Sequence, residues 1–181
     1  MMRQIAVTLF AAGLAVGAER WHDGKKIVPE EAGKTPNTSA FGDRVHFAGQ
    51  PGEDDLKLYA KRGVRTVINL RTPAEMEKVG FDEKAAVERN GMVYVHVPVQ
   101  SEPPADVDIQ RVMKILDGAK DAPVLMHCAS SNRVGMMWSI FRARQHGLAA
   151  GQALAEGKAA GMRNPALESA ARQNIEAKAK K

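Results

Sequence analysis

The only cysteine of the chain, Cys128, is followed after four intervening residues by Arg133, and this pair could act on an oxyanion. A cysteine thiolate is a nucleophile, and a guanidinium presents a planar fork of donors that fits two oxygens of a phosphate. The side chains between them are small, so the backbone N–H groups of this segment can approach a bound anion closely. The spacing predicts a nucleophile in an anion-binding loop. The alternative is a buried thiol beside a surface arginine.

The elements on either side of this loop would position it for anion binding. Residues 123–127 form a continuous apolar run, which is typical of a buried strand. Residues 134–146 place Met137, Trp138 and Phe141 on one helical face, and Gly147 follows as a C-cap. The first N–H groups of such a helix lack intrahelical partners, and its dipole adds positive charge at the loop. A thiolate at this point would be stabilised.

The rest of the chain alternates strands with helices. Predicted strands cover residues 44–48, 64–70 and 92–97, and predicted helices cover residues 53–62, 82–90 and 105–119. Two Ala-rich helices are expected at residues 148–162 and 165–178. This alternation predicts an α/β fold with a central, mostly parallel sheet flanked by helices. Ligands of such sheets bind at the carboxyl ends of strands, which is where Cys128 falls.

The N-terminus has the pattern of a secretory signal peptide. A short basic start at Arg3 precedes an apolar stretch over residues 5–16, and small residues then lead to a cleavage site after Ala18. We expect a signal peptide at residues 1–18, a lead-in segment with a leader strand or loose chain at residues 19–40, and one domain at residues 41–181. The mature protein would be periplasmic or secreted, without stable membrane insertion.

Composition restricts the remaining function classes. The chain has 181 residues, 44% of them hydrophobic, which suits a globular domain with a core. Cleavage after Ala18 would remove one positive charge and lower the formal net charge from +5 to +4. Basic residues do not form a stripe with interleaved aromatics, so nucleic-acid binding is not predicted. The five histidines do not cluster at ligand spacing, and neither a metal site nor a cofactor is expected.

Several motifs together resemble the cysteine-based protein tyrosine and dual-specificity phosphatases. They are HCASSNRVG at the loop and, elsewhere, FAGQPGEDDLKLYAKRGVRTVINLR, YVHVPV and GLAAGQALAEGKAAGM. Within that superfamily, the resemblance is closest to the bacterial phosphatase-like domain of beta-lactamase-hydrolase-like proteins. It extends from about Phe41 to Met162 and implies a tyrosine-phosphatase-like fold.

The resemblance also implies roles for the loop residues. Cys128 would attack phosphorus and form a cysteinyl-phosphate, which water would then hydrolyse. Arg133 and the loop N–H groups would bind the phosphoryl oxygens, and His127 would help to orient the nucleophile. The substrate would be a phosphorylated or other small oxyanionic molecule. The residues expected to line the substrate site are His127, Ala129, Ser130, Ser131, Asn132 and Arg71.

A proton donor for the leaving group is expected from the segment QSEPPADVD. Glu102, Asp106 and Asp108 are candidates, because a protonated carboxylic acid can give its proton to the departing oxygen. Asp106 could instead cap the helix that follows, and Asp108 could be a solvated first-turn acid. Arg71, at the end of another strand, could join the anion pocket or could only pair with Glu75.

Two other functions stay open at this point. The superfamily motif has five residues between cysteine and arginine, whereas four lie between Cys128 and Arg133. A loop of this length resembles that of rhodanese-like sulfurtransferases, which carry a persulfide on cysteine. The loop also lacks a glycine, and Val134 stands where a Ser or Thr often follows the arginine. These features would suit a non-catalytic module that binds an anion or a partner.

Overall fold

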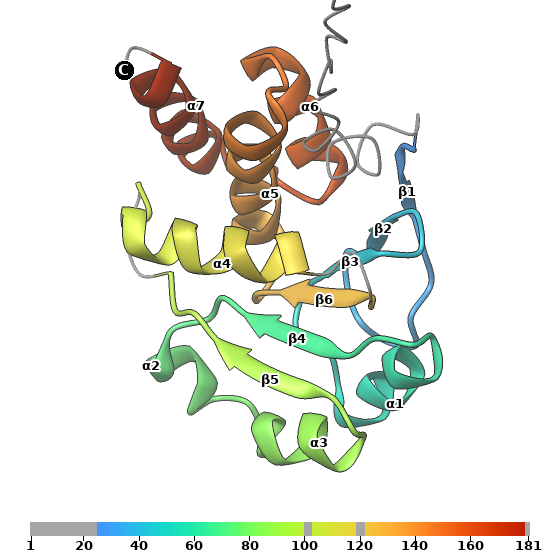
Figure 1. The fold of residues 1–181 in the computed structure, drawn as a ribbon. Helices are drawn as coiled ribbons and strands as arrows, with labels where there is room; N and C mark the ends of the chain where they lie inside the picture. Colours follow the sequence, from blue (N-terminus) through green and yellow to red (C-terminus); the bar gives the residue numbers. More distant parts are fainter. Residues whose placement is uncertain (1–24, 100–102, 119–121, 180–181) are drawn as a thin grey trace, which may run out of the picture.

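A six-stranded mixed sheet forms the centre of the protein (Figure 1). The computed structural model describes residues 25–99, 103–118 and 122–179. The strands are β1 (Ile27–Pro29), β2 (Ser39–Phe41), β3 (Val45–Ala48), β4 (Thr66–Asn69), β5 (Val93–His96) and β6 (Val124–His127). Their spatial order is β1-β2-β3-β6-β4-β5. The last four strands in this order are parallel to one another. Strand β2 is antiparallel to both of its neighbours, β1 and β3. The predicted α/β class with a mostly parallel sheet is confirmed.

Helices cover both faces of the sheet (Figure 1). One face carries α1 (Glu53–Lys61) and α3 (Glu83–Arg89), and the short α2 (Pro73–Met76) follows the end of β4. The other face carries α4 (Asp106–Gly118) and α5 (Asn132–His146), with α6 (Ala150–Ala159) and α7 (Pro165–Ala179) packed against α5. Alternate strand residues fill the two cores: Val67 faces the α1–α3 side, and Ile68 faces the α5 side.

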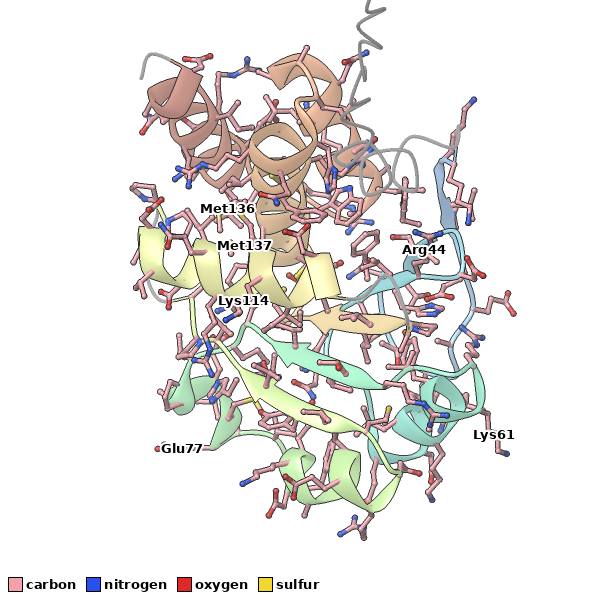
Figure 2. All side chains as sticks on the ribbon, viewed as in Figure 1. Arg44, Lys61, Glu77, Lys114, Met136 and Met137 are labelled. Carbon is pink, nitrogen blue, oxygen red and sulfur yellow. The ribbon has the colours of Figure 1, made fainter. Side chains whose placement is uncertain are left out.

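Helix α5 is the central packing element. All of its residues from Val134 to Arg142 are buried, because α6 and α7 cover the faces that the sheet and α4 leave free. Met136 and Met137 lie beside α4 (Figure 2). Trp138 packs on the sheet side, with its ring centroid 4.9 Å from that of Phe47. The predicted helical face with Met137, Trp138 and Phe141 is buried in the core, so the loop before α5 rests on a closely packed helix.

The segment expected as a leader strand or loose chain contributes β1 and part of β2 to the sheet. One element differs from the sequence-based expectation. Helix α2 was not predicted, although Thr72 caps it and Glu75 completes a capping box, with Pro73 at the first helical position. The predicted signal peptide and its cleavage site, like Glu102, lie outside the described residues. Within the described ranges, no helix is long and apolar enough to span a membrane.

Candidate active site

Cys128 lies at the carboxyl end of the central strand β6. The strands on both sides hold this point: the Cys128 N–H donates to the carbonyl of Ala48 (3.3 Å), and the Leu70 N–H donates to the carbonyl of His127 (2.9 Å). The Cys128 side chain is 1% exposed. The thiol therefore lies buried at the base of the loop, in a backbone fixed by β3 and β4.

The loop turns sharply into α5 at Ser131. This residue has φ 65° and ψ −1°, a left-handed conformation that usually favours glycine. The loop lacks a glycine, and Ser131 thus adopts a backbone conformation that glycine takes up without strain. The Ser131 side chain does not cap α5, because its hydroxyl donates to the carbonyl of Ala160 (2.7 Å). The first N–H groups of α5 consequently have no side-chain cap and point toward the loop.

Arg133 lies beside Cys128 and forms a bidentate pair with Glu75 from α2. Its two terminal nitrogens, Nη2 and Nη1, donate to Glu75 Oε1 (2.5 Å) and Oε2 (2.8 Å), and Nη1 also reaches the carbonyl of Val99 (3.3 Å). Burial alone would lower the pKa of Arg133, but the neighbouring Glu75 carboxylate and Cys128 side chain raise it. The guanidinium is therefore charged and oriented before any ligand arrives.

Arg71 follows the end of β4 and also contacts Glu75. Its Nη1 donates to Gln50 Oε1 (2.7 Å), and its Nη2 donates to the carbonyl of Glu75 (3.0 Å). Its Nε lies 3.9 Å from Glu75 Oε1 and, among the described residues, has no hydrogen-bond partner. The expected pairing of Arg71 with Glu75 is thus observed, and Glu75 links Arg71 to Arg133. A place for Arg71 in the anion pocket stays a prediction.

A buried carboxylate, Glu83, lies under the strand ends. It is 2% exposed, and its Oε1 lies 3.3 Å from Nε2 of His127, an ion-pair distance with poor hydrogen-bond geometry. Its oxygens accept from Gln50 (2.7 Å), Asn69 (2.6 Å) and Tyr94 (3.2 Å). Burial alone would raise the pKa of Glu83, but His127 and these donors lower it. An ionised carboxylate therefore ties α3 and three strand ends together.

We predict that Glu83→Gln lowers the free energy of unfolding by about 1–3 kcal/mol, the usual cost of leaving buried polar groups unsatisfied. The glutamine NH₂ would face N–H or O–H donors where the carboxylate now accepts. Urea denaturation measures the loss. Glu88→Gln is the matched control, because Glu88 is exposed on the same helix. Equal stabilities of the two variants would contradict the assigned role of Glu83.

We also predict that Glu75 makes folding acid-sensitive. Hydrogen bonds from Arg133 lower the pKa of Glu75 from 4.5 to about 2, against the opposing effect of burial. The folded state therefore binds this proton more weakly than the unfolded state. The pair stabilises the fold above about pH 4.5, and this contribution is lost as pH falls toward 2. The upper limit is about 3 kcal/mol, and water reduces it because the side chain keeps 30% exposure.

Acid unfolding followed by circular dichroism measures this contribution. Glu75→Gln should flatten the fall in stability over that pH range. Glu77→Gln is the control, because Glu77 is exposed after α2 and points away from the domain (Figure 2). A Glu75→Gln profile parallel to that of the wild type would show that the ion pair does not stabilise the fold.

The proton-donor candidates lie in different surroundings. Asp106 begins α4, and its carboxylate accepts from Arg144 (2.7 Å) and Gln110 (2.7 Å). Arg144 follows Arg133 by about three turns of α5, or roughly 16 Å along the helix axis. The structure therefore does not bring Asp106 together with the Cys128 loop. Asp108 lies half-buried in the first turn of α4. Glu102 stays a prediction.

The structure thus brings most of the predicted site residues together and adds others. His127, Arg133 and Arg71 converge at the strand ends, and the residues from Ala129 to Asn132 form the loop between Cys128 and Arg133. Sequence reasoning missed Glu75 as the partner of Arg133, and it missed Glu83 entirely. The capping box formed by Thr72 and Glu75 is visible in the sequence and could have predicted α2. It could not have shown that Glu75 pairs with Arg133. Among the described residues, no cluster of three or more His, Cys, Asp or Glu side chains could hold a metal ion.

Solved structures share this fold. Pseudomonas aeruginosa TpbA has a TM-score of 0.67 and 18% sequence identity, over 85% of this chain and 91% of TpbA. A TpbA variant in complex with pTyr has a TM-score of 0.66 at the same identity, over 85% and 90% of the two chains. Tk-PTP in its active form has a TM-score of 0.65 and 19% identity, over 78% and 97%. The fold is therefore that of cysteine-based tyrosine phosphatases.

Sequence comparison identifies the family. Beta-lactamase hydrolase-like proteins of two Xylella fastidiosa strains are 34% identical over 102 residues, which is 55% of this chain. The match spans only 23% of the length of those relatives. Residues 40–145 match the family described as Beta-lactamase hydrolase-like protein, phosphatase-like domain. Because this match covers more than half of the chain, the protein belongs to that family.

Proposed function

We propose that this protein is a cysteine-dependent phosphatase that cleaves phosphomonoesters. The observation that carries the proposal is the placement of Cys128 beside Arg133, at the uncapped N-terminus of α5. Backbone N–H groups of the loop and the Arg133 guanidinium would together bind a tetrahedral oxyanion there. The tyrosine-phosphatase fold and the pTyr complex of the TpbA variant support a phosphorylated substrate.

The reaction would proceed in two displacements. The Cys128 thiolate attacks phosphorus, an S–P bond forms, and the ester P–O bond breaks. The leaving oxygen takes a proton from an acid. Water then attacks phosphorus and loses a proton, the S–P bond breaks, and inorganic phosphate leaves with the thiolate regenerated. Arg133 and the loop N–H groups stabilise the charge that spreads over the equatorial oxygens in both steps.

We assign the proton donor to the segment QSEPPADVD, which ends in the first turn of α4. Glu75 is not our candidate, because its two oxygens accept from Arg133 and this pair holds the pKa of Glu75 well below its usual range. The Asp106 carboxylate accepts a hydrogen bond from Arg144, which lies about three helical turns from Arg133, so Asp106 is not our candidate either. Glu102 is our first candidate, because it follows the strand end at β5 and lacks the competing assignment of Asp106. Asp108 is the second.

A sulfurtransferase is the competing function, and one observation favours it. The loop has four residues between Cys128 and Arg133, as in the rhodanese-like loops. In that reaction, thiosulfate would transfer its outer sulfur to the thiolate, giving a Cys128 persulfide and sulfite. A non-catalytic module that binds anions or partners is the third reading, and it predicts neither chemistry.

Hydrolysis of p-nitrophenyl phosphate by the reduced protein between about pH 5 and 8 tests the proposal, because general acid catalysis is most efficient when the pKa of the acid is near the operating pH. Acid-quenched samples are then digested and analysed by mass spectrometry. A phosphate on Cys128 supports the phosphatase. A persulfide after thiosulfate treatment, without phosphate turnover, supports the competing function. If neither adduct forms and no phosphate ester is hydrolysed, only the non-catalytic binding module remains.

We further propose that the protein is exported. The basic start, the apolar stretch over residues 5–16 and the small residues before Glu19 support this. N-terminal sequencing of the protein from fractionated cells tests it. A mature start at Glu19 in the periplasmic or secreted fraction is expected, and an intact Met1 in the cytoplasm would overturn the proposal.

A further inference from the structure

The turn between α6 and α7, residues Ala160–Asn164, contacts the loop that carries Cys128. These residues follow the matched family range, which ends at residue 145. The turn nevertheless meets the loop at two successive residues, Ser131 and Asn132. The family resemblance reaches Met162, but none of the roles that it implies falls on this turn.

The first contact supports the strained point of the loop. Ser131 is fully buried in its left-handed conformation, and its hydroxyl donates to the carbonyl of Ala160 (2.7 Å). Gly161 lies directly against it. A Cβ placed on Gly161 would lie 2.6 Å from the Ser131 Cβ and 2.7 Å from its Oγ. Only a glycine lets the turn approach this closely, and Gly161 also has φ +110°.

The second contact holds the next residue of the loop. Asn132 Oδ1 accepts from the backbone N–H groups of Arg163 (2.6 Å) and Asn164 (2.9 Å). The Arg163 side chain donates to Asn37 Oδ1 (3.0 Å), and Asn37 donates to the carbonyl of Ser130 (3.3 Å). Three successive loop residues are thus connected to the turn. Their N–H groups are the ones that must converge on an anion.

We propose that the turn Ala160–Asn164 is a positioning element for the anion-binding loop, with Gly161 as its decisive residue. The turn holds Ser131 in the left-handed conformation that a loop glycine would adopt without help. The loop N–H groups are thereby arranged before the anion arrives, so ordering the loop on binding costs less. The inference rests on the proposed function only in that the loop binds a tetrahedral oxyanion. It does not require turnover.

Titration with inorganic phosphate, followed through the backbone amide NMR signals of residues 128–133, tests this. Gly161→Ala should weaken phosphate binding by at least about tenfold, because misplacement of binding groups by about 1 Å has effects of that order or larger. Gly147→Ala is the matched control. Gly147 also has a positive φ, 67°, but it caps the far end of α5, and a Cβ there would meet nothing within 4 Å. We expect both variants to be less stable than the wild type, but only Gly161→Ala to bind phosphate more weakly.

A double variant separates the contact from strain in the turn. Ser131→Gly removes the two nearest atoms that the new Cβ would meet, leaves only the Ser131 carbonyl oxygen at 3.3 Å, and tolerates the left-handed backbone. Combined with Gly161→Ala, it should recover most of the lost phosphate affinity. Failure of this rescue, wild-type affinity in Gly161→Ala, or an equal loss in Gly147→Ala would each overturn the inference.

The wild-type titration also distinguishes this inference from the proposed function. Phosphate binding that depends on Gly161, in a protein that hydrolyses no phosphomonoester, would retain the positioning role and reject the phosphatase. A wild-type protein whose loop amides do not respond to phosphate would overturn the positioning role itself.

Discussion

Cys128→Ser should lower kcat for p-nitrophenyl phosphate by at least about a thousandfold, because removal of an attacking nucleophile costs that much or more. Cys128 is the only thiol of the chain, so no other cysteine can substitute. A serine hydroxyl at the same position is protonated at neutral pH and is a weak nucleophile without an adjacent base. The substitution removes one sulfur and adds a smaller oxygen, which leaves the backbone bonds to Ala48 unchanged.

The control for this prediction is the phosphate titration of the same variant. Loop amides that still respond to phosphate would show that the cradle is intact and that only the attack on phosphorus is lost. Turnover within tenfold of the wild type would instead show that Cys128 is not the nucleophile. In that case, the fold would carry a different chemistry at this edge of the sheet.

Arg133→Lys should lower kcat/KM by about 10²–10³, the usual cost of removing an oxyanion donor. Lysine keeps the positive charge but is a point charge without the planar fork of arginine. It could therefore neither hold both oxygens of Glu75 nor present two donors to the phosphoryl group. We expect the main effect on kcat, because the charge on the equatorial oxygens is stabilised chiefly in the transition state.

Loss of the Arg133–Glu75 pair could also reduce activity through the fold, and a double variant separates the two effects. Arg133→Gln leaves the Glu75 carboxylate without its main partner, so both stability and kcat/KM should fall. Arg133→Gln combined with Glu75→Gln removes the unpaired charge and should recover stability in urea denaturation, but not activity. Recovery of activity in the double variant would show that Arg133 acts on the fold and does not contact the anion.

The local organisation of the chain could be predicted because it depends on periodicity. Strand β6 is a short apolar run, and α5 shows apolar spacing over residues 134–146 with Gly147 as its C-cap. These patterns report burial and local backbone conformation, so they located the loop between Cys128 and Arg133 at a strand end. The family resemblance added the expected chemistry. The comparisons confirm the family and the fold; the activity stays a proposal.

The identity of the supporting partners could not be predicted, because it depends on which distant segments meet. Glu75 lies 58 residues from Arg133 in the sequence, and its only expected partner was Arg71. Glu83 is one of several acidic residues near a helix start, and only burial against His127 distinguishes it. Asp106 was a reasonable acid by position, but its pairing with Arg144 depends on how α4 crosses α5.

The sequence by itself determined the positions of Cys128 and Arg133 and the strand and helix between which they lie, and on these the proposal of an anion site rests. The tertiary structure decided how that site is held. Parallel strand order brings the ends of β3, β6 and β4 together, and this places Glu75 and Glu83 at the loop. The packing of α6 and α7 on α5 brings Gly161 against Ser131 and allows a serine to take the place of a glycine. Local spacing specifies conformation, whereas contacts between distant segments form only when the whole core packs.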